Sequence, residues 1–160
     1  QFAGSSRRGR SGAVCLLTFA LIMHIELRND IQELAAAMTA LQEFAQAHAL
    51  DKAAAEAAEL VLDELLSNII RYGHAEAGQQ PIVLELEIED GSLCIRISDG
   101  GIPFDPFDRP APDLGLSIEE REPGGLGIHL VKHFMDEYSY SYRERRNIVT
   151  LKKKLAPGQA

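Results

Sequence analysis

Three polar residues of one predicted helix, Glu64, Asn68 and Arg71, are of types that can move a proton or hold a metal-chelated phosphate. Their spacing of four and then three residues places them on one face of a helix. A carboxylate can act as a general base, an amide oxygen can ligate a cation, and a guanidinium can contact phosphate. Leu60 and Val61 border this row, which favours the wall of a cleft. Taken alone, the row is also what an ordinary solvated helix face shows.

A second candidate group combines an acidic residue with glycines. Asp99 follows a predicted strand, so its carboxylate either caps its own turn or accepts a hydrogen bond from a ligand amino group. Gly101, two residues later, would leave room for a flat base. Gly125 and Gly127 begin a predicted helix, where backbone N–H groups and the partial positive charge of the helix suit a phosphate. A purely structural role for these two glycines would be a helix cap or a hinge. They match neither a dinucleotide-binding fingerprint nor a P-loop.

The hydrophobic periodicity predicts the elements that would hold these residues. Alternating segments predict five strands, and segments with helical spacing predict three helices. In chain order they are a strand at 24–28, helices at about 30–49 and 51–73, strands at 82–88 and 93–97, a helix at 126–135, and strands at 137–143 and 148–154. This order predicts an α+β two-layer sandwich with the helices on one face of a mostly antiparallel sheet.

Caps and turns mark several of the predicted boundaries. Asn29 or Asp30 is expected to cap the first helix, and Asp51 the second. Gly73 is a suitable residue to follow the end of the second helix. Asp90-Gly91 predicts a two-residue hairpin turn. Residues 102–125 have no regular periodicity, and a loop of that length inside a domain is usually functional or mobile.

Length, charge and cysteine content narrow the classes of protein. The chain has 160 residues, enough for one domain, with a net charge of −8. Six basic residues and no acidic ones lie in 1–22 and 151–160, so residues 23–150 carry a more negative net charge than the whole chain. Such a charge argues against direct binding of nucleic acid. Cys15 and Cys94 form no C-x-x-C pair, which favours a reducing cytoplasm.

The N-terminal segment has several interpretations. Residues 13–23 are apolar and follow arginines, as in a signal peptide, but the run is too short to span a membrane and lacks a small-x-small cleavage site. Met23 could instead be a native start, or residues 14–22 could form an extra strand. We therefore divide the chain into an extension at 1–22, one domain at 23–155 and a tail at 156–160, with no membrane partner.

The motifs together resemble a known family. Helix Glu-x-x-x-Asn, then Ser98-Asp-Gly-Gly-Ile-Pro-Phe-Asp-Pro106, a long loop, and Gly124-Gly-Leu-Gly-Ile-His-Leu-Val131 are similar to the N, G1 and G2 boxes of the GHKL (Bergerat) ATP-binding superfamily. The short length and the forms of the boxes look most like the anti-sigma factor serine-protein kinases of the RsbW type. The resemblance covers about residues 25–155 and implies a Bergerat ATP-binding fold.

The resemblance implies a role for each candidate residue. Glu64 would be the general base, and Asn68 would bind Mg²⁺. Asp99 would accept from the adenine amino group and Gly101 would shape the base pocket. The residues that would contact the phosphates are Gly125, Gly127, and more weakly Arg71 and Arg121.

The same resemblance implies ATP and Mg²⁺ as cofactors and two protein partners. These are a sigma factor, which the protein would hold inactive, and an anti-anti-sigma (STAS-domain) protein, which it would phosphorylate on serine or threonine. A homodimer is left open. The sequence departs from the family at Tyr72, where many relatives have His, and at Asn147-Ile148, where a Thr commonly supports the adenine contact.

Two other functions remain as alternatives. One is a nucleotide-dependent protein that sequesters a partner without phosphotransfer, which the intact Glu64 disfavours. The other is the catalytic half of a histidine kinase, which the sequence disfavours because no helix pair with a phosphoacceptor His precedes the domain. His129 and His133 have a metal-like spacing, but no third ligand accompanies them.

Overall fold

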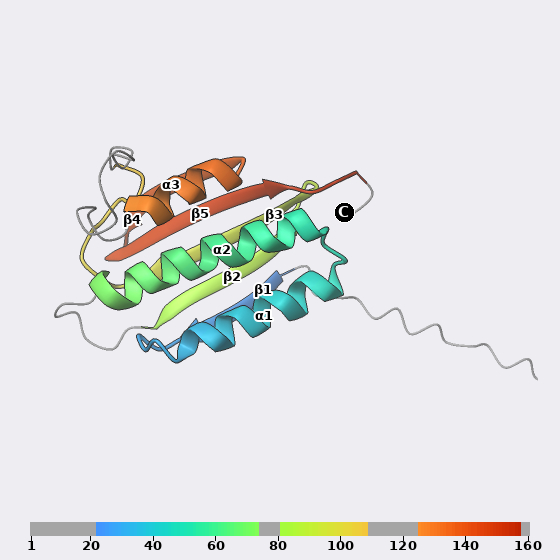
Figure 1. Cartoon of the computed structure of the whole chain (residues 1–160). Coiled ribbons are helices and arrows are strands. Elements are labelled where there is room, and N and C mark those ends of the chain that lie inside the picture. The colour runs from blue at the N-terminus through green and yellow to red at the C-terminus, as the bar shows by residue number, and fades with distance from the viewer. Residues whose placement is uncertain (1–21, 74–80, 109–124, 158–160) are drawn as a thin grey trace, which may run out of the picture.

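The computed structural model describes residues 22–73, 81–108 and 125–157 (Figure 1). Within these ranges, three α-helices cover one face of a five-stranded antiparallel sheet with the strand order β1-β2-β3-β5-β4. The predicted α+β sandwich is therefore confirmed. The elements are β1 (Ile22–Leu27), α1 (Glu33–Ala47), α2 (Lys52–Asn68), a π-helical turn η1 (Ile69–Gly73), β2 (Ile82–Glu89), β3 (Ser92–Asp99), α3 (Gly125–Phe134), β4 (Glu137–Arg143) and β5 (Arg146–Lys154).

The hydrophobic core lies between the sheet and the helices. Alternate residues of β2, β3 and β5 point toward the helices and are almost fully buried, as strand geometry requires. Leucines and a phenylalanine from α1 and α2 pack onto them, giving each helix one buried stripe. The largest of these buried side chains are Leu41, Phe44, Leu62, Leu66, Leu84, Leu86, Ile95, Ile97 and Leu151.

Two predicted boundaries at the N-terminal side were wrong by a few residues. β1 begins at Ile22, which we had assigned to the N-terminal extension. α1 begins only at Glu33, because Asp30 accepts a hydrogen bond from the backbone N–H of Gln32 at 2.9 Å and holds a turn ahead of the helix. The predicted alternative strand at 14–22 otherwise lies outside the described residues.

Two hairpin turns set the register of the sheet. Asp90 and Gly91 both have positive φ angles, +50° and +70°, as a type I′ turn requires. The predicted hairpin between β2 and β3 is therefore confirmed. β4 and β5 are joined in the same way by Glu144 and Arg145, at φ +51° and +62°, although neither residue favours that conformation.

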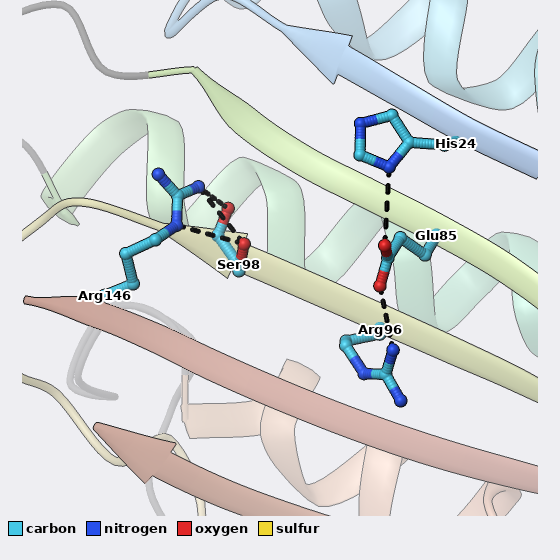
Figure 2. Close-up of polar contacts among 5 residues, drawn as sticks. All are labelled: His24, Glu85, Arg96, Ser98 and Arg146. Carbon is cyan, nitrogen blue, oxygen red and sulfur yellow. Dashed lines mark hydrogen bonds and ion pairs between the residues drawn. The ribbon is translucent and has the colours of Figure 1, made fainter. Parts of the chain in front are cut away.

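Polar side chains cover the other face of the sheet (Figure 2). Glu85 on β2 accepts from Arg96 Nη1 on β3 at 2.9 Å and lies 3.4 Å from His24 Nδ1 on β1. The hydrogen bond from Arg96 lowers the pKa of the Glu85 carboxyl group. These cross-strand contacts link three strands on the side away from the helices. Among the described residues, no helix is long and apolar enough to cross a membrane.

Candidate functional site

The predicted site residues meet at one end of the sheet. The last turns of α2, the end of β3 and the start of α3 lie together there (Figure 1). α2 lies over the middle of the sheet and packs against α3, so its polar face borders the first turn of α3. Three segments that are distant in the sequence therefore supply one group of polar residues and glycines.

Glu64 and the start of α3 are in direct contact. A methyl group added to Gly127 would lie 2.6 Å from the Glu64 Cδ atom, which is closer than such atoms ever approach. Glu64 is half-buried, and Asn68 follows one turn later as the last residue of α2. The carboxylate, the amide and the N-terminus of a ten-residue helix therefore lie next to one another. Such a group can hold an anion and a cation side by side.

We had predicted that the second helix runs to Gly73, but the regular helix α2 ends at Asn68. Residues 69–73 widen into a π turn, and Gly73 does not have the positive φ angle of a helix-ending glycine. Instead, the Gly73 carbonyl accepts a hydrogen bond from the backbone N–H of Ile102 at 3.2 Å. The turn thus joins α2 to the segment after β3. It also breaks the regular spacing between Asn68 and Arg71, and Arg71 is exposed.

Asp99 is held at the end of β3 and is only 5% exposed. Its Oδ1 atom accepts from the Gly101 backbone N–H at 2.8 Å and from Asn147 Nδ2 at 3.0 Å. Within the described residues, no hydrogen bond reaches Oδ2. A methyl group at Gly101 would overlap the Gly73 carbonyl and lie 2.7 Å from Asp99 Oδ1. The absence of a side chain at 101 therefore lets two backbone segments close around the carboxylate.

Asn147 is the residue that we had treated only as a departure from the family pattern. It is 5% exposed and uses both ends of its amide. Nδ2 donates to Asp99 and, at 2.9 Å, to the Ile102 carbonyl. Oδ1 accepts from the Phe104 backbone N–H at 3.1 Å and from the Tyr140 hydroxyl at 2.8 Å. A long-range network of this kind leaves no local signal in the sequence.

Arg146, the neighbour of Asn147, holds the end of β3 from the opposite face of the sheet (Figure 2). Its Nη2 atom donates to the Ser98 carbonyl at 2.9 Å and to the Pro81 carbonyl at 3.0 Å, and Nε donates to Ser98 Oγ at 3.2 Å. Successive residues of a strand point to opposite faces. β5 therefore fixes Ser98 from outside and Asp99 from inside.

The segment after Asp99 is also anchored. Lys132 on α3 donates to the Phe107 carbonyl at 2.8 Å. The Phe107 ring packs against the Tyr138 ring on β4, with 4.8 Å between centroids. Residues 102–108 therefore run from the end of β3 to the edge of the sheet in a fixed path.

Not every candidate residue can be placed. Arg121 and most of the predicted loop at 102–125 lie outside the described residues, and of Gly125 only its backbone position at the start of α3 is described. His129 and His133 are exposed on α3. In the described ranges, no group of three His, Cys, Asp or Glu side chains could hold a metal ion.

Comparison with known proteins identifies the family. Residues 27–153 match the histidine kinase-like ATPase domain, HATPase_c_2, which spans most of the chain. The chain belongs to this family, as the resemblance to the GHKL superfamily had predicted.

Individual relatives are named as serine or serine/threonine protein kinases and as anti-sigma factors. The chain is 34% identical to the serine/threonine-protein kinase BtrW of Bordetella bronchiseptica over 98 residues, covering 61% of this chain and 69% of BtrW. It is 27% identical over 101 residues to the anti-sigma F factor of Bacillus licheniformis, covering 62% and 69%. It is 28% identical over 103 residues to the serine-protein kinase RsbW of Listeria monocytogenes, covering 62% and 66%.

A solved structure has the same fold. The crystal structure of the RsbU and RsbW domains of Rv1364c from Mycobacterium tuberculosis superimposes with a TM-score of 0.62 at 16% identity. The match covers 84% of this chain and 32% of that chain, so this chain corresponds to about a third of the larger protein.

Proposed function

We propose that the protein is an ATP-dependent serine/threonine kinase that also acts as an anti-sigma factor. The observation that carries this proposal is the grouping of Glu64, Asn68, Asp99 and the start of α3 at one end of the sheet, in a chain of the histidine kinase-like ATPase family. Family membership supports nucleotide binding, and the polar group supports the position of the nucleotide.

The Asp99 carboxylate suits the adenine end of the nucleotide. Protein donors occupy Oδ1, and within the described residues Oδ2 has no hydrogen-bond partner. A buried carboxylate oxygen normally has a donor, so an adenine amino group would satisfy it. Gly101 lets the Gly73 carbonyl lie against the Asp99 turn, which supports the position of this carboxylate.

The opposite part of the site suits the phosphates. Backbone N–H groups at the start of α3, around Gly125 and Gly127, would contact phosphate oxygens. Asn68 would hold Mg²⁺ together with the phosphates, since Mg²⁺ is usually bound by few protein ligands plus substrate oxygens. The cation would neutralise charge on the phosphates. Arg71 and Arg121 are further candidates for phosphate contacts.

Glu64 is the proposed general base. It would orient the attacking hydroxyl of the protein substrate and accept its proton. Transfer of a phosphoryl group depends mainly on positioning and electrostatic stabilisation, so no covalent intermediate on this chain is needed.

The proposed partners follow from the relatives. An anti-sigma F factor and two serine or serine/threonine kinases among them support a sigma factor and an anti-anti-sigma protein as partners of this chain. Both would be met in the cytoplasm, where bacterial transcription takes place.

The experiment measures the effect of two substitutions on Mg-ATP binding and on phosphotransfer to a purified anti-anti-sigma (STAS-domain) protein. Asp99→Ala should weaken ATP binding by roughly 1.5–3 kcal/mol, the scale of a hydrogen bond to a charged group. Glu64→Gln should bind ATP normally but lower transfer by on the order of 10²–10⁴. Asp63→Asn is the matched control, because Asp63 is the exposed neighbour of Glu64 on α2.

The outcomes separate the functions. Normal phosphorylation by Glu64→Gln would show that the base is assigned wrongly. If the wild-type protein binds ATP and its partner but transfers no phosphate, it is the alternative, a nucleotide-dependent sequestering protein. If calorimetry detects no ATP binding, the whole proposal fails.

A further inference from the structure

The amide of Asn147 makes four hydrogen bonds, and only an amide in this orientation provides the two donors and two acceptors that its neighbours need. Its NH₂ group faces two acceptors, Asp99 Oδ1 and the Ile102 carbonyl, at 3.0 and 2.9 Å. Its carbonyl oxygen faces two donors, the Phe104 N–H and the Tyr140 hydroxyl, at 3.1 and 2.8 Å. An amide has two donor hydrogens and two acceptor lone pairs on these atoms, so its full hydrogen-bonding capacity is used.

This arrangement fixes the rotation of the Asp99 carboxylate. Donors from two directions, Gly101 N–H and Asn147 Nδ2, hold Oδ1 against the protein. A partial rotation of the carboxylate would break both bonds inside a site that is 5% exposed, where lost hydrogen bonds are costly, and a half-turn only exchanges two equivalent oxygens. Oδ2 is thereby presented in a constant direction.

Tyr140 completes the arrangement from the edge strand β4. Its hydroxyl donates to Asn147 Oδ1 and also lies 3.2 Å from the Phe104 N–H. A turned-over amide would set its NH₂ group against the Phe104 N–H and its oxygen against Asp99, so these groups fix its orientation, and the Tyr140 hydroxyl adds a second hydrogen bond to Oδ1 in that orientation. Burial raises the pKa of the Tyr140 hydroxyl, which keeps it protonated as a donor at neutral pH.

We propose that Asn147 and Tyr140 are positioning residues that make the site selective for a purine with a 6-amino group, by holding Asp99 with one oxygen turned to the base. This inference rests on the proposed function, since it concerns the same nucleotide site. Neither residue needs to touch the nucleotide, and their effect is transmitted through Asp99.

The test uses a nucleotide that lacks the amino group. Calorimetry with Mg²⁺ measures the Kd of ATP and of purine riboside triphosphate for each variant. The wild-type protein should bind ATP roughly tenfold to a hundredfold more tightly, the worth of a hydrogen bond to a charged group. Asn147→Asp, which has the same shape but replaces the NH₂ group with an acceptor oxygen, should lower this ratio to within about threefold of one.

A milder substitution and a control accompany it. Tyr140→Phe removes one hydroxyl and should lower the ratio by roughly twofold to fivefold, since the Phe104 N–H still holds Asn147. Tyr138→Phe, on the same strand, should leave the ratio unchanged, because the Tyr138 ring is retained against Phe107 and its side chain is exposed.

The ratio of the two Kd values decides the matter. Loss of affinity for ATP alone supports the proposal. Equal loss for both nucleotides means that Asn147 is merely structural and overturns it, as does an unchanged ratio. If Asn147→Asp does not fold, Tyr140→Phe decides by the same ratio. A wild-type protein that binds neither nucleotide defeats the proposed function itself, which is a distinct result.

Discussion

Gly101 and Gly127 lack side chains for different reasons. At Gly101, the space for a methyl group is taken by a backbone carbonyl, that of Gly73, which cannot move alone. At Gly127, the same space is taken by the carboxylate of Glu64, which is the far end of a flexible side chain. Two glycines from neighbouring motifs are therefore expected to respond differently to the same substitution.

Gly101→Ala should destabilise the protein. The added methyl group forces the η1 turn away from the end of β3 and disturbs the Asp99 turn, so we expect a loss of about 1–3 kcal/mol, as for overpacked interiors. ATP affinity should fall with it. Urea denaturation measures the change, and an unaltered midpoint would show that Gly73 does not restrain this position.

Gly127→Ala should affect catalysis more than stability. Alanine favours a helix over glycine by about 1 kcal/mol, which offsets some of the crowding. Glu64 must rotate away, however, and a base displaced by about 1 Å can cost on the order of 10²-fold in rate. Stability should change little while phosphotransfer falls. Full transfer activity in a stable Gly127→Ala protein would contradict the assigned position of Glu64.

Among the elements, the two hairpin turns show what local sequence can and cannot predict. Asp90-Gly91 is a recognisable signal and Asp51 is a recognisable cap, whose carboxylate accepts from the Ala54 N–H at 2.8 Å. The β4–β5 turn uses Glu144 and Arg145, which give no such signal, and only pairing of the two strands imposes its shape. The π turn after Asn68 was missed for a similar reason, since its contact with Ile102 is distant in sequence.

The strained turn can be relieved. A non-glycine residue in the left-handed region costs roughly 1–2 kcal/mol, so the pair Glu144→Asn and Arg145→Gly should raise the free energy of unfolding by about that amount. Urea denaturation of the double variant tests this. The reciprocal control is Gly91→Ala, which has open space around it but a φ angle of +70°, and should lose about 1 kcal/mol. No gain in the double variant would mean that the turn is not strained.

At the scale of the whole molecule, the two faces of the sheet have separate roles. The helix side holds the core and the site, and the other side carries the cross-strand contacts of Glu85. Arg96 lowers the pKa of Glu85, and the backbone N–H of Lys154 lowers the pKa of Asp136 near the end of α3. Both carboxylates are therefore more stable as anions in the folded protein than in the unfolded chain.

This arrangement predicts sensitivity to acid. A carboxylate whose pKa is lowered by folding stabilises the protein above its unfolded pKa, about 4, and this contribution is lost as the pH falls through the folded pKa. Stability should therefore decline below about pH 4. Glu85→Gln should show a shallower decline than the wild-type protein in denaturant titrations at successive pH values. Equal slopes would exclude Glu85 as a source of the effect.

The fold and the site differed in how far the sequence predicted them. Alternation and helical spacing predicted every described strand and α-helix but not the π turn η1, and motif residues such as Glu64 and Asp99 lie close to the expected glycines. The network around Asn147 could not be predicted, because its four partners lie in residues 99–104 and at Tyr140 on β4, which only the folded sheet brings to Asn147.

Arg146 and Asn147 are adjacent in β5 and therefore point to opposite faces of the sheet. The site thus depends on the alternation of side chains along this strand. Deleting Ile148, which separates them from the buried Val149 and Leu151 of the same strand, would exchange their directions, putting a guanidinium in the interior and an amide in solvent. Every residue of the proposed nucleotide site would still be present in such a protein, yet Asp99 would lose its contact with Asn147. Length changes in the β4–β5 hairpin should therefore be tolerated in natural homologues only where they leave the alternation of β5 intact.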